Sequence, residues 1–437
     1  MMKTIDLRNA SPSRIELARL VPRAAMDVDS ATAAAAQLIA EVRSGGAQAL
    51  LAQAQRLDGI LPTHIRVHSG EIAVAMQNLD PAVRDALEEA IDRVTRATKS
   101  QVPTPTVTEI APGAQIIQRW QPIARVGFYV PGGKAVYPSS VVMNVVPAQV
   151  AGVGSVALAS PPQKAFGGAV HPTILAAAGL LGVEEVYAMG GAGAIGALAY
   201  GVPELSLDPV ELITGPGNVY VASAKRLVRG VTGIDSEAGP TEILVIADET
   251  ASAALVAADL VSQAEHDELA AAVLVTTSHE LANAVLVELD RLASATRHSA
   301  RVREALGGQQ SAVVLVSDLA QAVSFSNAYG PEHLEIHTAQ PGAVLDLVDS
   351  AGAIFLGEYS PVSLGDYLAG SNHVLPTGGQ SRFASGLGAY TFLRPQQVIR
   401  YDRDALRAVE SRIVALSAAE DLPAHGDAIT ARFPANG

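Results

Sequence analysis

Residues 124–130 read ARVGFYV, a short apolar run typical of a buried β-strand. Similar runs occur at 155–160 (SVALAS) and 184–190 (EEVYAMG). The stretches rich in small residues that follow these runs, which we expect to be helices, are 143–152, 170–181 and 193–201. Strands that alternate with helices in this way predict an α/β unit with a parallel sheet.

The same texture returns from residue 242 onwards. The predicted strands are 242–248 (EILVIAD), 272–277 (AVLVTT), 312–317 (AVVLVS) and 353–357 (AIFLG), and the predicted helices are 251–266 and 279–295. Two consecutive strand–helix series imply two α/β units, each built on a largely parallel sheet.

The parts of the chain outside the two series are expected to be mainly helical. At 80–98, Asp80 can cap a helix, Pro81 suits its first position, and an apolar stripe runs along one face. Prolines within 101–118 interrupt this pattern and indicate a connecting segment. The tail at 395–437 is expected to be helical, and such a tail often packs on a neighbouring subunit.

The composition fits a compact globular protein with two or three folded units. The chain has 437 residues, of which 49% are hydrophobic and 17% are charged. It contains no cysteine, so a metal site would need histidine, carboxylate or amide ligands. The redox compartment stays undetermined, because a protein without thiols folds in an oxidising or a reducing environment.

Charge and hydropathy argue against nucleic-acid and membrane partners. The formal net charge is −14, and no Lys/Arg cluster supplies the basic stripe that nucleic-acid binding requires. The N-terminal sequence lacks the continuous apolar segment of a signal peptide. Glycine and proline interrupt the most apolar stretches, 141–160 and 169–201, which we interpret as buried strands and helices. We therefore expect a cytoplasmic protein.

Gln263 and His266 are candidate metal ligands. They are three positions apart near the end of a predicted helix, so they share a face and could bind one ion through an amide oxygen and an imidazole nitrogen. A polar helix end, with His266 placed favourably against the helix dipole, is the alternative interpretation.

Asp366 and His373 lie in the segment SLGDYLAGSNHVLPTGG, whose glycine and serine content predicts a loop. A carboxylate and an imidazole there could complete a metal site or bind a polar ligand. The alternative is a solvated turn in which Asp366 accepts hydrogen bonds from backbone N–H groups.

Glu332 and His333 are candidates for general acid–base catalysis, because histidine titrates near neutrality. Adjacent side chains diverge on a strand, so a cooperating pair needs a bend, which the preceding Gly-Pro at 330–331 can provide. A surface Glu-His pair is the alternative. His425, beside Glu420 in the tail, is by itself more typical of a solvent-facing histidine.

Glycine loops at 130–135 (VPGGKA), 190–196 (GGAGAIG) and 215–218 (GPGN) indicate sharp turns or a close approach of the backbone. The second loop satisfies G-x-G-x-x-G after a predicted strand. However, no acidic residue ends a second strand about 20 positions later, as the dinucleotide-binding fingerprint requires.

Together these segments resemble the histidinol dehydrogenase family. The motifs that carry the resemblance are FYVPGGKA (128–135), GPGNVYVASAKR (215–226), AGPTEILVIAD (238–248), SQAEHD (262–267), GPEHLEI (330–336) and GDYLAGSNHVLPTGG (365–379). They follow the family's order, and the tail adds Glu420 and His425. The combination is highly specific, although each motif alone is not.

The resemblance implies a zinc-dependent, NAD-linked dehydrogenase. Its reaction would be the four-electron oxidation of L-histidinol through L-histidinaldehyde to L-histidine, the last steps of histidine biosynthesis. The family's zinc ligands fall on Gln263, His266, Asp366 and His425. The family also implies a homodimer with shared active sites, in which His425 reaches the site from the partner subunit.

The resemblance also assigns the remaining site residues. The family's acid–base pair falls on Glu332 and His333. We expect His333 to remove the hydroxyl proton as hydride leaves, and Glu332 to activate water against the aldehyde. Substrate contacts fall on Thr241, His333, His373 and Glu420 besides the four metal ligands, and NAD contacts on Tyr129, Gly193 and Asn218. Gly193 stands where the family commonly has Gln, and Thr241 replaces the more usual Ser but keeps the hydroxyl.

The predicted fold class is α/β, with two Rossmann-like, incomplete parallel-sheet domains plus small helical N- and C-terminal segments. The expected divisions are a helical segment at 1–27, a first α/β domain at 28–127 and 242–384, a second at 128–241, and a helical tail at 385–437. The first α/β domain would carry the metal and catalytic residues and the second the NAD side. The tail would pack on the partner subunit.

Three other functions stay open at this point. A sister enzyme of the same fold could oxidise another small alcohol, such as a sulfonated diol, although Glu420 and His373 favour histidinol because a sulfonate would prefer cations. A zinc hydrolase could use Glu332 to activate water for cleavage. A metal- or nucleotide-binding protein without catalysis would leave the Glu332-His333 pair idle.

Overall fold

The computed structural model describes residues 2–24, 28–132 and 135–434. Gly133 and Lys134 of the predicted glycine loop at 130–135 therefore lie outside the described residues. The chain forms two compact units, one of residues 1–101 and 123–392 and the other of residues 102–122 and 393–437.

The first unit contains a six-stranded parallel sheet that includes the second predicted strand series. Its order is β1 (Lys3–Asp6), β11 (Ala312–Leu315), β10 (Ala271–Thr276), β9 (Glu242–Ala247), β12 (His333–His337) and β13 (Ala353–Leu356). The strand β12 was not predicted. Its polar residues at alternate positions interrupt the continuous apolar run that predicts a buried strand, although this strand is buried along its whole length.

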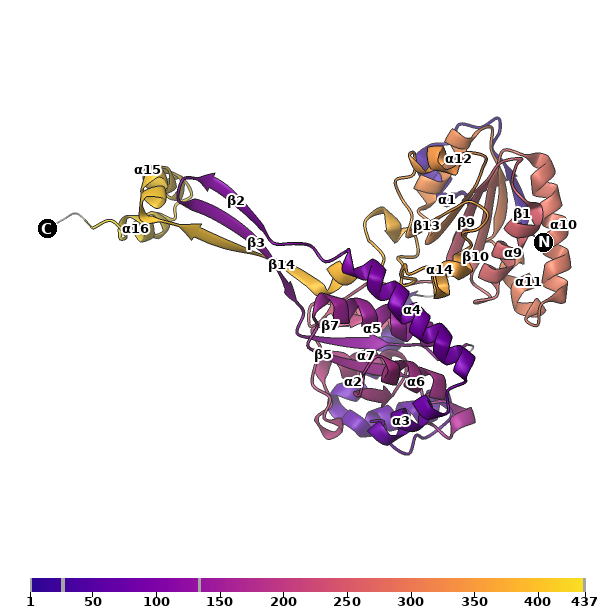
Figure 1. Ribbon diagram of the computed structural model, residues 1–437, viewed down its shortest axis with the longest axis horizontal. Helices are drawn as coiled ribbons and strands as arrows, with labels where there is room; N and C mark the ends of the chain where they lie inside the picture. The colour runs from indigo at the N-terminus through magenta and orange to yellow at the C-terminus, as the bar shows by residue number, and fades with distance from the viewer. Residues whose placement is uncertain (1, 25–27, 133–134, 435–437) are drawn as a thin grey trace. The chain divides into compact units, whose positions relative to one another are not determined.

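Helices cover both faces of this sheet (Figure 1). Ile243 and Val245 of β9 belong to a core shared with one set of helices, and Leu244 and Ile246 to a core shared with another, because side chains alternate along a strand. The first set is α9 (Ala253–Ala264), α10 (His279–Ala295) and α11 (Ser299–Gly307), and the second is α1 (Arg14–Leu20), α12 (Leu319–Tyr329) and α13 (Pro341–Leu345).

A five-stranded parallel sheet in the same unit includes the first predicted strand series. Its order is β6 (Val186–Ala188), β5 (Ser155–Ser160), β4 (Arg125–Tyr129), β7 (Leu212–Thr214) and β8 (Gly233–Ile234). The connecting helices are α5 (Pro138–Ala151), α6 (Pro172–Leu180), α7 (Gly191–Tyr200) and α8 (Val219–Val228). The helices expected between and after these strands are thus confirmed.

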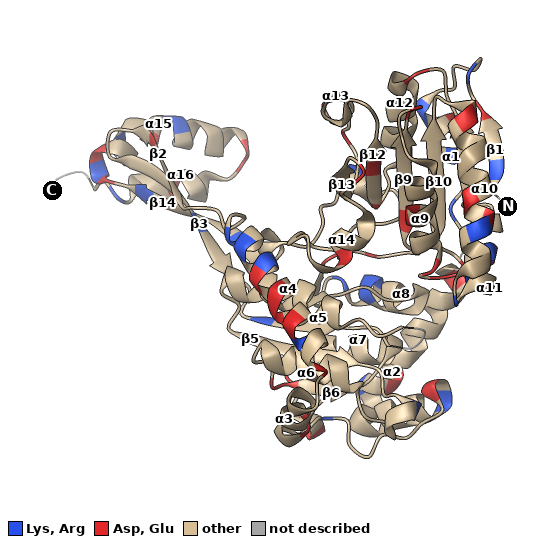
Figure 2. Cartoon of the chain, turned by 45° about the vertical axis from the view of Figure 1, so that its right-hand side comes forward, with Lys and Arg blue, Asp and Glu red and all other residues tan. Residues whose placement is uncertain are grey.

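Three N-terminal helices pack on the helices of the five-stranded sheet. Helix α2 (Val28–Gln53) contacts α7 and α8, α3 (Ser69–Gln77) contacts α6, and α4 (Pro81–Lys99) contacts α5. They come from the range 28–127, which had been expected to join the domain of the six-stranded sheet. Helix α4 begins as predicted, with Asp80 as its cap, and Figure 2 shows acidic and basic bands along it.

The second unit holds a three-stranded antiparallel sheet and two helices. The sheet order is β14 (Leu393–Tyr401), β3 (Ala114–Pro122) and β2 (Thr106–Ala111), followed in the chain by α15 (Arg403–Ala419) and α16 (Pro423–Thr430). The connecting segment expected at 101–118 and the wholly helical tail expected at 395–437 are therefore wrong in these parts.

The physical reason is that β2 is exposed along its whole length and so lacks the apolar alternation that marks a half-buried strand. The prolines indicated a connecting segment, but Pro112 lies in a turn between two strands. Ala111 pairs with Ala114, so Pro112 and Gly113 form a two-residue turn in which Gly113 has a φ of +74°, and the proline lies outside the paired positions. The N-terminal segment 1–27 likewise contains β1 besides the helix α1.

The predicted α/β class with two parallel sheets is confirmed. Among the residues described, none of the helices combines the length and the apolar character that crossing a membrane would require.

Candidate active site

Helices α9 and α14 bring three of the predicted metal ligands into one unit. Gln263 lies in the last turn of α9 and His266 just after its end, while Asp366 lies in α14 (Val362–Tyr367). His266 Nε2 and Asp366 Oδ2 are 3.9 Å apart. The loop expected around Asp366 is wrong at this residue, because Glu335 Oε1 accepts a hydrogen bond from Val362 N–H (2.8 Å) at the start of a short helix.

The amide of Gln263 has a defined orientation. Its Nε2 donates to Thr241 Oγ1 (2.7 Å), and the Thr241 hydroxyl donates to Glu332 Oε2 (2.6 Å). Gln263 Oε1 is buried and finds no hydrogen-bond partner within the described ranges. Because an unsatisfied buried acceptor costs about 1–3 kcal/mol, the amide oxygen is a natural ligand atom.

These donors fit a zinc ion. Zinc bonds to oxygen and nitrogen are about 2.0–2.2 Å long, so two ligand atoms in a tetrahedral site lie about 3.4 Å apart. The 3.9 Å separation between His266 and Asp366 is close to that spacing. Burial lowers the pKa of His266, against the opposing influence of Asp366, and so favours the neutral imidazole that coordinates metals.

Both residues of the predicted acid–base pair contact the backbone of Glu242 on the neighbouring strand. Glu332 Oε2 accepts a hydrogen bond from the Glu242 N–H (2.8 Å), while His333 Nδ1 lies 3.0 Å from the Glu242 carbonyl oxygen. A carbonyl oxygen only accepts, so Nδ1 carries the proton and Nε2 has the free lone pair. His333 Nε2 is buried and unpartnered in the part of the chain that is described.

Glu332 has an unusual protonation behaviour for a carboxyl group. Burial raises its pKa to about 7, while His333, the Thr241 hydroxyl and the Glu242 N–H act in the opposite direction. A carboxyl group with a pKa near neutrality can both take up and release a proton under physiological conditions. The expected bend is present, since Gly330 has a φ of +61° and the strand β12 begins only at His333.

His373 connects Asp366 to the helix α5 of the five-stranded sheet. Its Nδ1 lies 2.9 Å from the Asp366 carbonyl oxygen, and its Nε2 lies 3.0 Å from Ser140 Oγ. Burial lowers the pKa of His373, against the influence of Asp366, so the ring is kept neutral. A predicted substrate contact therefore lies against a predicted metal ligand.

Two predicted residues belong to the second unit. Glu420 is the residue that follows α15, and His425 lies in α16. Both are exposed in the single chain. Their roles as substrate contact and metal ligand stay predictions.

The predicted NAD contacts lie at the carboxyl ends of strands of the five-stranded sheet, where parallel α/β sheets bind their ligands. Tyr129 ends β4, and its hydroxyl accepts a hydrogen bond from Gly191 N–H (3.1 Å). Burial raises the pKa of Tyr129 to about 12, so the phenol stays neutral. Asn218 caps α8, with Oδ1 accepting from Tyr220 N–H (3.1 Å).

Gly193 lies inside α7 and faces the side chain of Gln53. A Cβ atom at position 193 would lie 2.0 Å from Gln53 Oε1. Gln53 is buried, and its Nε2 donates to the Leu38 carbonyl oxygen (3.0 Å) and to Glu41 Oε2 (3.0 Å). The space beside Gly193 is thus filled by a side chain from α2.

The similarity to known proteins spans the whole chain. The family model described as histidinol dehydrogenase matches residues 21–433. The histidinol dehydrogenase of Leifsonia xyli subsp. xyli is 69% identical over 99% of each chain, and that of Nocardia farcinica is 57% identical over 99% of this chain and 98% of the relative. A crystal structure of histidinol dehydrogenase from Elizabethkingia anophelis has a TM-score of 0.92 and 31% identity, over 99% of this chain and 98% of that one.

The chain belongs to the histidinol dehydrogenase family. It is accordingly an oxidoreductase that acts on histidinol in histidine biosynthesis. The resemblance stated from the motifs is confirmed.

Sequence reasoning missed the pair that fixes the GPGN loop of this family member. Lys225 is 1% exposed, forms an ion pair with Asp235, and donates from Nζ to the Gly215 carbonyl oxygen (3.0 Å). Asp235 Oδ2 accepts from Gly215 N–H (2.9 Å). A signal was present, because Lys225 falls on the apolar face that Val221 and Val228 define at helical spacing.

A second missed group lies on β12 beyond His333. Glu335 Oε2 and His337 Nε2 are 3.4 Å apart, and Asp259 of α9 lies close to both. Burial and the neighbouring Glu335 raise the pKa of Asp259 to about 7. The alternation of polar residues in HLEIH was the available signal, since positions two apart share one face of a strand.

Proposed function

We propose that this chain oxidises L-histidinol through L-histidinaldehyde to L-histidine with two NAD molecules, at a zinc site formed by Gln263, His266, Asp366 and His425 of the partner subunit. The observation that supports it best is the pair of buried, unpartnered atoms within the described residues, Gln263 Oε1 and His333 Nε2. The chain Gln263–Thr241–Glu332 connects one of these atoms to the acid–base pair.

The bound zinc ion would supply Lewis-acid chemistry, orienting the amino alcohol and assisting loss of its hydroxyl proton. Gln263 is prepared for this role because Thr241 already holds its amide nitrogen, so that only the oxygen is free. The neutral state of His266 supports its assignment as a ligand.

His333 acts as the base in the first oxidation. Its Nε2 lone pair accepts the hydroxyl proton of histidinol, the carbonyl bond forms, and the hydride passes to NAD⁺. The Glu242 carbonyl oxygen holds the Nδ1–H, which keeps the ring in the required tautomer and stabilises the imidazolium once it forms.

Glu332 acts in the second oxidation. Its carboxylate takes a proton from water as the water oxygen bonds to the aldehyde carbon and the carbonyl π electrons move onto the aldehyde oxygen. This hydrate anion then re-forms a C=O bond as its hydride passes to another NAD⁺, which leaves the carboxyl group of histidine. The pKa of about 7 supports this role, because the group is deprotonated in a large fraction of molecules at neutral pH. Thr241 keeps the carboxylate in place through its hydroxyl.

The substrate and cofactor contacts complete the proposal. Glu420 and His373 position the amine and imidazole of histidinol, and Tyr129 and Asn218 contact NAD beside Gly193. Because Gly193 lacks a side chain and Gln53 fills the adjacent space, position 193 contributes only backbone. The biosynthetic role supports the predicted cytoplasmic location, and the exposure of His425 in the single chain is compatible with the predicted homodimer.

The deciding experiment combines zinc content with turnover. Protein with one zinc per subunit should produce two NADH per histidinol, followed by absorbance, and lose activity after chelation until zinc is restored. One NADH with release of free aldehyde would contradict the four-electron route. Turnover of a sulfonated diol in place of histidinol would identify the sister enzyme, and hydrolysis without NADH the hydrolase.

A further inference from the structure

The segment 64–68 is fixed against the edge of the five-stranded sheet. Ile65 and Val67 are buried, and the backbone bonds Ala188 N–H to Ile65 O (2.7 Å) and Val67 N–H to Val186 O (2.9 Å) pair the segment with β6. Side chains alternate along such an extended segment, so His64 and His68 point to the same outer side.

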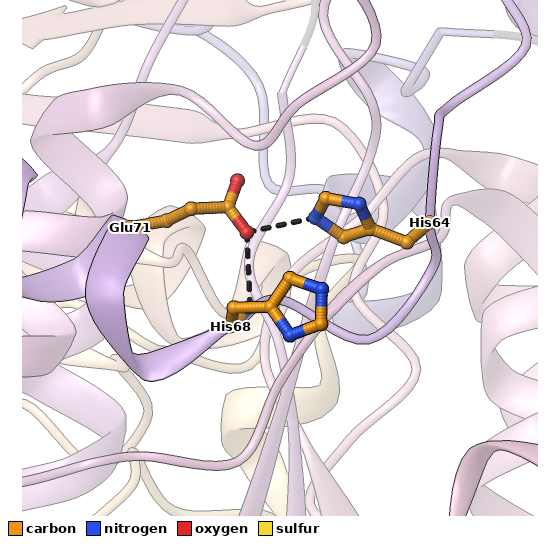
Figure 3. Close-up of side chains that lie close together, drawn as sticks. All are labelled: His64, His68 and Glu71. Atoms are coloured by element: carbon orange, nitrogen blue, oxygen red, sulfur yellow. Dashed lines mark hydrogen bonds and ion pairs between the residues drawn. The ribbon is translucent and has the colours of Figure 1, made fainter.

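Helix α3 adds a carboxylate to these two imidazoles. Glu71, in the first turn of α3, has Oε1 2.7 Å from His64 Nε2 and accepts a hydrogen bond from His68 N–H (2.9 Å). The two histidine rings have centroids 4.5 Å apart. One potential ligand atom from each residue lies within 4.8 Å of the others. Figure 3 shows the side chains of His64, His68 and Glu71 close together.

We propose that His64, His68 and Glu71 form a second metal site, for a borderline divalent cation such as Zn²⁺ or Ni²⁺. Two imidazoles and one carboxylate are the ligands that such ions prefer when thiolates are absent. The site differs from the catalytic one in belonging to the edge of the five-stranded sheet, and its partial exposure leaves positions for water ligands.

The charge at the site favours a cation. Burial acts to raise the pKa of Glu71, but the hydrogen bonds from His68 N–H and from His64 outweigh it and hold the pKa below its ordinary value. The carboxylate is therefore ionised at neutral pH. Binding requires that His64 Nε2 lose the proton that it donates to the carboxylate and move from 2.7 Å to about 3.4 Å from the carboxylate oxygen, the spacing of two ligands on one zinc ion.

A competing cluster, Asp259–Glu335–His337, satisfies the same spacing. Proton binding reduces the negative charge of this cluster, because burial and Glu335 raise the pKa of Asp259 to about 7, and Glu335 raises the pKa of His337 against the effect of burial. Glu335 is fully buried, whereas the three residues at the sheet edge are reached from solvent. The edge cluster is thus the better candidate.

Occupancy would add a further link between two segments that already contact each other. The metal would connect the extended segment 64–68 to the first turn of α3, and α3 packs on α6. A ligand that binds only the folded state stabilises it in proportion to the logarithm of its concentration over Kd. We therefore expect the thermal midpoint to rise with Ni²⁺ concentration beyond the point at which the catalytic site is full.

The test is a calorimetric titration of the full-length dehydrogenase with Ni²⁺ and with Zn²⁺ after chelation. The parent chain should bind two ions per subunit. The variant His64→Ala/His68→Ala should bind one and keep histidinol turnover with zinc restored, while Glu71→Gln should weaken the second site by about tenfold or more. Gln also serves at this helix position, so Glu71→Gln keeps the cap and removes only the charge.

The matched control is His279→Ala/His298→Ala, which removes two histidines outside the cluster and should leave both ions bound. His266→Ala separates the two sites, because it should lose turnover and one ion but keep the ion bound at the edge. The proposal is overturned if His64→Ala/His68→Ala binds as many ions, with the same affinity, as the control. It is also overturned if the parent chain binds only the catalytic ion.

Discussion

Lys225 and Asp235 form a buried ion pair that binds both peptide groups of Gly215. The ammonium donates to the Gly215 carbonyl oxygen (3.0 Å), and the carboxylate accepts from the Gly215 N–H (2.9 Å). Gly215 has a φ of +116°, and a Cβ there would lie 2.0 Å from the Tyr129 carbonyl oxygen. Charged side chains thus hold the loop before Asn218 against the end of β4.

Replacing Lys225 should weaken NAD binding and leave the zinc content unchanged. In Lys225→Met, Asp235 is left as a buried, unpaired charge, so we expect the free energy of unfolding to fall by about 3–5 kcal/mol. The KM for NAD should rise by roughly tenfold, because the loop loses its anchor, while zinc content stays at the parent value. Denaturant unfolding and steady-state kinetics measure both effects.

Arg226→Met is the control for that experiment. Arg226 pairs with Glu237 at the surface, where an ion pair contributes less than about 1 kcal/mol. Asp235→Asn provides a milder variant if Lys225→Met unfolds. An unchanged KM for NAD in folded Lys225→Met or Asp235→Asn protein would show that the ion pair Lys225–Asp235 has no part in positioning the loop.

Glu332→Gln should separate the two oxidations. Glutamine keeps the size and the hydrogen bonds but accepts no proton, so aldehyde formation should persist while aldehyde oxidation falls by about 10²–10⁴-fold. In the parent chain the rate of aldehyde oxidation should rise as pH increases through about 7, where Glu332 loses its proton. Stopped-flow NADH formation from histidinol and from histidinaldehyde measures the steps, and an equal fall in both contradicts the assignment.

Thr241→Val should shift the pH dependence of the second step. The Thr241 hydroxyl lowers the pKa of Glu332, so its loss should raise that pKa above about 7 and move the profile to higher pH. Thr241→Ser keeps the hydroxyl and should keep the profile. A Thr241→Val profile that coincides with the parent profile would exclude this hydroxyl as an influence on Glu332.

Mixing two inactive variants should restore activity if His425 reaches the site of the partner subunit. His266→Ala and His425→Ala damage the same site from different chains, so a mixed dimer contains one site with all four ligands intact. Activity should reappear after the two variants are unfolded and refolded together. Absence of recovery, with mixed dimers demonstrated by differently tagged subunits, would place His425 outside the partner's site.

The parallel sheets were predictable because their buried strands are continuous apolar runs. The spacing of Gln263 and His266 also identified a shared helix face, and the structure puts both at the end of α9. What the sequence did not reveal is that β9 and β12 are neighbours. That pairing brings Glu332 to Thr241 and to the Glu242 peptide, contacts between residues about 90 positions apart.

Other elements escaped because they lack a local signal. Strand β2 is exposed throughout, and the strand at Leu393–Tyr401 is exposed at most of its positions, so neither shows the apolar alternation that sequence analysis requires. The role of Lys225 was hidden for a related reason. A lysine on an apolar helix face attracts notice only when its buried partner, ten residues away at Asp235, is known.

The backbone and the side chain of Glu242 make contacts with different residues. Its peptide group contacts Glu332 and His333, whereas its carboxylate binds Arg23 (2.5 Å) and Gly378 N–H (3.0 Å). Mutation can delete a carboxylate but not a carbonyl. The proton of His333 is therefore held on Nδ1 by a backbone oxygen that any amino acid at position 242 would provide. A substitution at this position can remove the contacts of the carboxylate, but it leaves Nε2 of His333 as the base.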